Sequence, residues 1–101
     1  MSYQFEWNDD KAKANRIKHG VSFDEASTVF DDPLARIFDD AVHSLNERRE
    51  IIIGQSMNER LLLVSFTARP GEIIRIISAR ALTKKERKDY EEAVKRRRAQ
   101  R

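Results

Sequence analysis

The sequence has no cysteine, only two prolines and three glycines, and no long apolar run. Without cysteine, disulfide bridges and thiolate metal sites are excluded, which is compatible with a reducing compartment. The longest apolar runs, such as Leu61–Val64, are far too short for a transmembrane helix, and the first residues contain no apolar stretch like that of a signal peptide. We therefore expect a cytoplasmic protein with no membrane association.

Its length of 101 residues predicts a single domain over residues 1–101 with one hydrophobic core. The net charge is only +3, but residues 1–50 contain 7 Lys+Arg and 11 Asp+Glu, whereas residues 51–101 contain 13 and 6. Such a polarised chain can present a basic face to phosphates, which is a reason to consider nucleic acid as a ligand. The basic tail, residues 95–101, is also explained as a solvated helix end.

Two helices are predicted in the first third of the chain. Residues Tyr3–Trp7 are expected to form a short strand, and Asn8 or Asp9 is then expected to cap a helix that runs to about Lys18 and ends at Gly20. The stretch Ser22–Glu25 has the spacing of a capping box, which begins a second helix. Asp31-Asp32-Pro33 ends it, because proline disfavours helix at the residue before it.

The middle of the chain predicts an antiparallel sheet of about four strands. These are Leu34–Asp40, Glu50–Ser56, Arg60–Thr67 and Glu72–Arg80. The third is apolar at consecutive positions and is expected to be central and covered on both faces, whereas the first is mixed and suits an edge. A second capping box at Thr83–Glu86 begins a C-terminal helix to about Arg98. The fold class is therefore α+β.

Arg75 and Arg80 lie within and at the end of the last apolar strand. A guanidinium in such a place needs a carboxylate, a backbone acceptor or an anionic ligand. Pairing with Asp39, Asp40 or Glu47 is the structural explanation, and bidentate phosphate binding is the functional one. In a regular strand the two arginines point to opposite faces, unless a bulge near Ser78-Ala79 brings them together, so Arg80 is the stronger candidate.

The other candidates are polar residues suited to proton transfer. Histidine is the side chain most easily poised for this near neutral pH, and the chain has two, His19 at a helix end and His43 in a loop. Each also has a structural explanation, as does Tyr90, which is expected to pack the last helix on the sheet.

The acidic pairs Asp31-Asp32 and Asp39-Asp40 raise a metal site as an alternative, but their spacing matches no known metal-binding loop. The chain has no glycine-rich phosphate loop, H-E-x-x-H or G-x-S-x-G. Nucleotide triphosphatase, zinc protease and serine hydrolase functions therefore have no support.

Four stretches carry a family resemblance: FEWNDDKAKANRIKHGVSFDEASTVFDDP, HSLNERREIIIGQS, LLLVSFTAR and RIISARALTKKERKDYE. Together they resemble the BrnT toxins of bacterial type II toxin–antitoxin systems from Phe5 to Tyr90. The resemblance implies a compact RelE-like fold with two N-terminal helices, the sheet and a C-terminal helix. It also implies a metal-independent endoribonuclease that inhibits translation and has no cofactor. Its partner would be a BrnA-like ribbon-helix-helix antitoxin, through which alone it would contact DNA.

The resemblance also directs attention to particular residues. We expect RNA to lie across the exposed sheet face, where Arg80, with Arg75 or Arg69, holds the scissile phosphate. His43 or Glu47 would take the proton of the ribose 2′-hydroxyl, and His19, Lys18 or Tyr90 would protonate the leaving oxygen. Lys18, Arg48 and Arg69 are the RNA-binding candidates. The alternative is a noncatalytic module that binds nucleic acid or a partner within a repressor complex.

Overall fold

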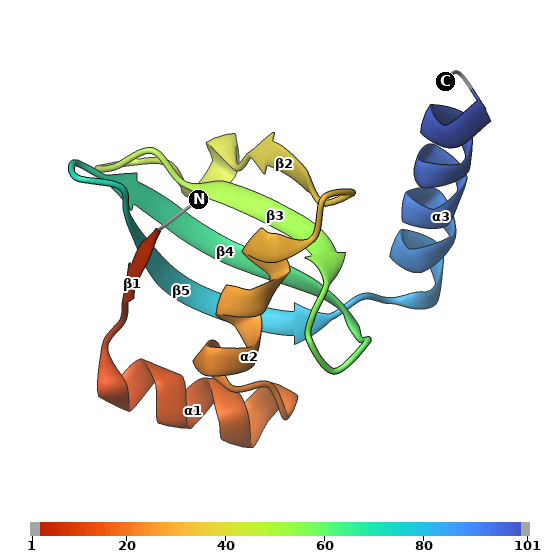
Figure 1. Cartoon of the computed structure of the whole chain (residues 1–101). Helices are drawn as coiled ribbons and strands as arrows, with labels where there is room; N and C mark the ends of the chain where they lie inside the picture. Colours follow the sequence, from red (N-terminus) through yellow and green to blue (C-terminus); the bar gives the residue numbers. More distant parts are fainter. Residues whose placement is uncertain (1–2, 100–101) are drawn as a thin grey trace.

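The computed structural model describes residues 3–99. Within them, five strands form one sheet in the order β1-β5-β4-β3-β2 (Figure 1). The strands are β1 (Gln4–Glu6), β2 (Arg36–Asp39), β3 (Glu50–Gln55), β4 (Leu61–Arg69) and β5 (Ile73–Ala81). The helices are α1 (Asp9–His19), α2 (Phe23–Thr28) and α3 (Lys84–Ala99), with short 3₁₀ turns η1 (Val29–Asp31) and η2 (Ala41–His43).

The α+β class and the order of elements are confirmed, but the sheet has one strand more than predicted. The four expected strands pair antiparallel, while β1 joins the sheet parallel to β5 and makes it mixed. The N-terminal strand was expected, but sequence alone did not place it beside β5. Because of this pairing, Glu6 lies next to Arg75.

Helices α1 and α2 lie on one face of the sheet (Figure 1), and the hydrophobic core fills the space between these helices and the sheet. The core residues from the sheet are Ile52, Leu62, Val64, Phe66, Ile74, Ile76 and Ala79. On the other face, which we call the open face, the strands present Ile51, Ile53, Leu63, Ser65, Arg75 and Arg80, all of which are half-buried. The central strand β4 is therefore buried on the helix side and only partly covered on the open face, where full burial was predicted.

The predicted caps begin both N-terminal helices. Asn8 accepts a hydrogen bond from the Lys11 backbone N–H, and Gly20 ends α1 with a φ of 68°, which glycine adopts without strain. Ser22 caps α2 by accepting from the Glu25 N–H, but the Glu25 side chain does not complete the box. It turns instead to Ser56 and Arg60 in the β3–β4 hairpin.

Gly54 lets β3 approach the chain that follows α2. A Cβ at this position would lie 2.8 Å from the Ala35 Cβ and 3.0 Å from Asp32 Oδ2. Asp32 in turn accepts from the Gln55 and Leu34 backbone N–H groups at 2.8 and 2.9 Å. Asp32, which belongs to one of the acidic pairs considered as a metal site, thus holds the backbone in place.

Helix α3 follows β5 and stands at the end of the sheet away from α1 (Figure 1). Its capping box is complete: Thr83 Oγ1 accepts from the Glu86 N–H, and Glu86 Oε1 accepts from the Thr83 N–H. The helix continues through Ala99, so residues 95–99 of the predicted basic tail are helical and residues 100–101 lie outside the described residues. In residues 3–99, no helix has both the length and the apolar character to cross a membrane.

Candidate active site

A bulge in β5 brings the two arginines of this strand to the same face. Phe66 of β4 pairs with Ile76 and its neighbour Ser65 pairs with Ser78, so Ile77 is the extra residue. The buried side of β5 consequently changes from the even positions Ile74 and Ile76 to Ala79. Arg75 and Arg80 therefore both lie on the open face, roughly 16 Å apart along the strand. The bulge that would reconcile them was expected near Ser78-Ala79 and lies at Ile77.

Arg80 forms a two-pronged ion pair with Glu86 of α3. Its Nη1 and Nη2 lie 2.8 and 3.0 Å from the two carboxylate oxygens, and Nη1 also donates to the Ala81 carbonyl. Hydrogen bonds from Arg80, together with that from the Thr83 N–H, lower the pKa of Glu86 to about 2. The Arg80 side chain is still 37% exposed. A solute anion can therefore reach the guanidinium.

Arg75 is paired with Glu6 across the β1–β5 ladder. Its Nη1 lies 2.9 Å from Glu6 Oε2, and Arg69 Nε lies 3.3 Å from the same oxygen. Arg75 is 34% exposed. Two guanidinium groups thus share one carboxylate, which leaves a net positive charge at this end of the open face.

The predicted partners of these arginines were wrong. The expected carboxylates were Asp39, Asp40 and Glu47, all of which lie in or beside the segment between β2 and β3. The actual partners are Glu6 of β1, which is 69 residues from Arg75 in the sequence, and Glu86 of α3, which is six residues from Arg80. Both guanidinium groups therefore have a carboxylate partner within the protein, but neither pair is sealed from solvent.

Asn15 of α1 holds the backbone of β5 next to Arg80. Among residues 3–99 the outer edge of β5 has no strand partner beyond Arg75. Asn15 takes that place with two hydrogen bonds to Ala79, one to its carbonyl at 2.8 Å and one from its N–H at 3.1 Å. A third bond from Asn15 goes to the Val21 carbonyl. The side chain is buried, so its three partners fix the position of the strand.

The loop candidates lie at the other end of the sheet from Arg80. His43 Nδ1, at the end of η2, is 2.9 Å from Oδ2 of Asp40, the residue before η2, and Glu47 Oε1 is 3.7 Å from Arg49 Nε. Arg48 pairs with Asp39 at 2.7 Å, and its carbonyl accepts from Thr67. Since Thr67 lies opposite Arg75 and Leu63 opposite Arg80, this loop is on the Arg75 side.

The α1 candidates Lys18 and His19 occupy the exposed last turn of that helix, on the side of the sheet that carries the core. Tyr90 lies on α3 and is near the Arg80 end. Its hydroxyl is 3.3 Å from the Leu34 carbonyl and 3.4 Å from Asp32 Oδ2. Burial and the Asp32 carboxylate raise the pKa of Tyr90 to about 12, so the hydroxyl stays protonated at neutral pH. These contacts fit the expected packing role.

Among residues 3–99, no group of three or more histidine and carboxylate side chains is placed to hold a metal ion. Two acidic residues of the candidate site were missed by sequence reasoning, namely Glu6 and Glu86. Glu86 could have been found from the sequence, because it lies only six residues after Arg80, but it was interpreted only as a member of the capping box. Glu6 could not have been found in this way, because its contact with Arg75 depends on the parallel pairing of β1 with β5.

The comparisons with known proteins agree on one family. Residues 7–86 match the family model described as the ribonuclease toxin BrnT of type II toxin–antitoxin systems. The structure is similar to the 1.1 Å crystal structure of the Brucella abortus ribonuclease toxin BrnT, with a TM-score of 0.63 and 21% sequence identity over 82% of this chain and 100% of that chain. No curated protein sequence matches this chain at a significant level.

Proposed function

This chain belongs to the BrnT family of ribonuclease toxins of type II toxin–antitoxin systems, and from that premise we propose a metal-independent endoribonuclease that cleaves RNA and thereby inhibits translation. The observation that supports the proposal is the β5 bulge, which puts Arg75 and Arg80 on one accessible sheet face. Single-stranded RNA would lie along β5, with one phosphate at Arg80 and another at the Arg69–Arg75 pair. Its partner would be a BrnA-like ribbon-helix-helix antitoxin, with DNA contacted only by the complex.

Arg80 would bind the scissile phosphate by exchanging its carboxylate partner for the phosphodiester. The planar guanidinium fits two phosphate oxygens as well as it fits the two oxygens of Glu86. During attack, negative charge accumulates on those phosphate oxygens, and a fixed cation beside them stabilises the transition state. Loss of one such donor typically costs about 2–4 kcal/mol.

The carboxylate displaced from Arg80 is a suitable base. Glu86 is held at a pKa of about 2 chiefly by Arg80, so a phosphate that takes over the guanidinium raises the pKa of Glu86 toward its ordinary value. Glu86 would then accept the proton of the 2′-hydroxyl as its oxygen attacks phosphorus, and the bond to the 5′-oxygen breaks to leave a cyclic phosphate. Of the three candidates for protonating that 5′-oxygen, Tyr90 lies on the Arg80 side, whereas Lys18 and His19 lie on the core side of the sheet.

His43 and Glu47 would act as bases only on a phosphate bound at the Arg75 end, because the structure places them there. Two substitutions distinguish a reaction at the Arg80 end of the open face from one at the Arg75 end. Glu86→Gln should lower cleavage if the reaction takes place at Arg80, whereas His43→Gln should lower it if the reaction takes place near Arg75.

The defining experiment is incubation of the purified protein with RNA in EDTA. We expect fragments that end in cyclic phosphate, and Arg80→Ala should reduce their rate of formation by roughly 30- to 1,000-fold. Arg87→Ala is the matched control, since it removes an exposed arginine of α3, the helix that follows the strand of Arg80. Cleavage by Arg80→Ala at the parental rate would exclude Arg80 from the site, and cleavage abolished by EDTA would favour a metal mechanism.

A noncatalytic binding module is the second candidate function. The observation in its favour is that both arginines already have carboxylate partners, as structural arginines do. It predicts that the protein binds RNA in EDTA and leaves the RNA intact.

A further inference from the structure

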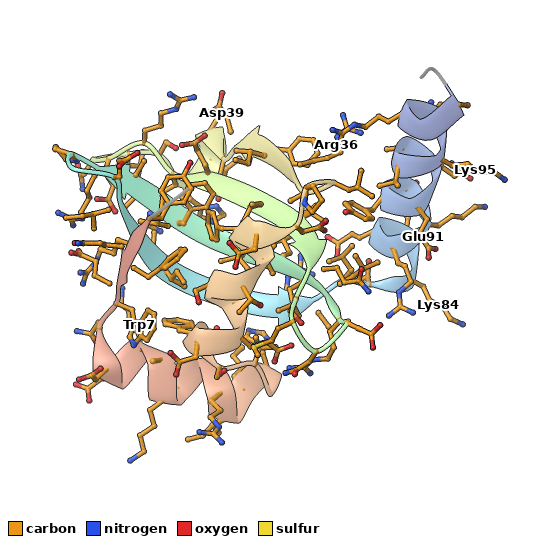
Figure 2. The ribbon with its side chains drawn as sticks, in the orientation of Figure 1. Trp7, Arg36, Asp39, Lys84, Glu91 and Lys95 are labelled. Atoms are coloured by element: carbon orange, nitrogen blue, oxygen red, sulfur yellow. The ribbon has the colours of Figure 1, made fainter. Side chains whose placement is uncertain are left out.

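A cavity of about 290 Å³ lies between the open face and α3. Ile53 of β3 forms part of its lining, with Arg36 and Phe38 of β2 on one side and Tyr90 and Ala93 of α3 on the other. Figure 2 shows Arg36 on β2, on the side of the sheet nearest α3. Glu86 also lines the cavity, so the cavity adjoins the Arg80–Glu86 pair.

Phe38 is the aromatic residue of β2 that lines this cavity. Its ring is on the open face, opposite Ile51, and the residue is 44% exposed. The Arg36 guanidinium lies over the ring, 5.6 Å from its centroid. An exposed aromatic ring beside a guanidinium is the combination of groups on which bases of single-stranded RNA stack.

The polar groups of the cavity favour one kind of base edge. The carboxylates of Glu86 and Asp89 only accept hydrogen bonds. Glu86 is bonded by Arg80 and Thr83 in the free protein and is the proposed base in the RNA complex, so Asp89 is the carboxylate left to bind a base edge. Asp89 has only an exposed contact of 3.5 Å with Lys85 among the ion pairs of residues 3–99. A carboxylate of this kind pairs with adjacent N–H donors, and guanine presents two of them on its Watson–Crick edge. Arg96, also in the lining, adds positive charge for a phosphate.

We propose that this cavity binds one base of the RNA, next to the phosphate held by Arg80, with the base stacked on Phe38 and guanine preferred through Asp89. The inference rests on the proposed function and adds a base-binding site to it. The volume is just below the range of about 300–1,000 Å³ that is typical of small-molecule sites, which suits one base with its ribose. The other exposed apolar side chains nearby, Ile37, Val42 and Leu45, are not in this lining.

The test uses uridine octamers in which every 2′-hydroxyl is O-methylated, so that they bind and are not cleaved. One octamer contains only uridine, and three others contain a single central guanine, adenine or cytosine. Fluorescence anisotropy measures their affinity for the full chain and for Phe38→Leu, Phe38→Trp, Asp89→Asn and Ile37→Leu. Ile37→Leu is the matched control, because Ile37 lies on the other face of the same strand. Thermal melting checks that each variant is folded.

We expect the guanine octamer to bind most tightly, Phe38→Leu to weaken every octamer about tenfold or more, and Phe38→Trp and Ile37→Leu to bind like the parent. Asp89→Asn should remove the preference for guanine. Unchanged affinity and preference in Phe38→Leu and Asp89→Asn, with RNA cleavage by the parent intact, would overturn the base site alone. A parent that neither binds these octamers nor cleaves RNA would overturn the proposed function as well. If Phe38→Leu instead binds RNA normally but loses a co-expressed antitoxin, the cavity is a protein interface and the proposal is wrong.

Discussion

The molecule contains two glutamate–arginine pairs of the same chemistry in different surroundings. Glu25 and Glu86 each receive two guanidinium hydrogen bonds, from Arg60 and Arg80, and both carboxyls have a pKa of about 2. The Glu25 side chain is 7% exposed and is also bonded by Ser56, which joins α2 to the β3–β4 hairpin. The Glu86 side chain is 32% exposed and borders a cavity. Arg60 is itself 42% exposed, but an exchange of its partner for a ligand would leave the buried Glu25 carboxylate without its counter-charge, whereas the Glu86 carboxylate released by Arg80 would face solvent.

The largest expected difference between the pairs is in stability. Arg60→Ala leaves the buried Glu25 carboxylate without its main counter-charge and should lower the free energy of unfolding by about 3 kcal/mol or more. Arg80→Ala leaves an accessible carboxylate and should cost about 1 kcal/mol or less. Urea unfolding of the two variants and the parent measures this. Equal losses of stability in Arg60→Ala and Arg80→Ala would contradict the distinction between a buried and an accessible carboxylate.

The contributions of the two pairs to stability should also differ as the pH is lowered. The pKa of Glu25 is about 2 in the folded protein, against an ordinary value of 4.5, so its contribution to stability is complete above pH 4.5 and is lost as the pH falls toward 2. That contribution is about 3 kcal/mol. Glu86 should add less, because solvent screens its pair. Unfolding at pH 5, 4 and 3 should show a steep loss in the parent and a shallower one in Arg60→Ala. The same slope in both would contradict the assignment.

Asn15→Ala should lower both the stability of the protein and its rate of RNA cleavage. It leaves the buried N–H and carbonyl of Ala79 without partners and should cost about 2 kcal/mol. Because Ala79 precedes Arg80, the RNA cleavage rate of the folded variant should also fall. Arg60→Ala is the control, since it loses stability but should retain the cleavage rate when assayed well below its melting temperature. Full activity in Asn15→Ala would show that β5 keeps Arg80 in place without this contact.

The smallest expected effect concerns the Arg75 end of the open face. If Arg75 binds one flanking phosphate, Arg75→Ala should reduce the slope of log affinity against log salt concentration by about 0.7 for single-stranded RNA. Arg60→Ala should leave the slope unchanged. The slopes come from titrations at several salt concentrations, and an unchanged slope in Arg75→Ala would confine RNA to the Arg80 end.

Local sequence signals predicted much of the fold. The caps at Asn8, Ser22 and Thr83 begin the three helices, and the apolar runs coincide with β3, β4 and β5. These features depend on neighbours within a few residues. The parallel position of β1 and the bulge at Ile77 depend on contacts between distant segments, and no short pattern encodes them.

The candidate site was harder to predict for the same reason. Arg75 and Arg80 were identified as unusual because they interrupt an apolar strand, but their partners Glu6 and Glu86 are set by tertiary structure. Asn15 was not singled out in the sequence, although its side chain binds β5 from 64 residues away. The side chains that stand out in sequence are therefore those in conflict with their local element, and the groups that position them do not stand out.

The central claim, that Arg80 exchanges Glu86 for an RNA phosphate, is tested most directly by the titration of the Glu86 carboxyl. Carbon-13 NMR of the carboxyl can follow its pKa in the free protein and in the complex with the O-methylated guanine octamer. We predict a pKa of about 2 in the free protein and a rise toward 4.5 in the complex, because the phosphate takes the guanidinium. A pKa that remains about 2 when the protein is saturated with RNA would show that Arg80 keeps Glu86, and would contradict the account.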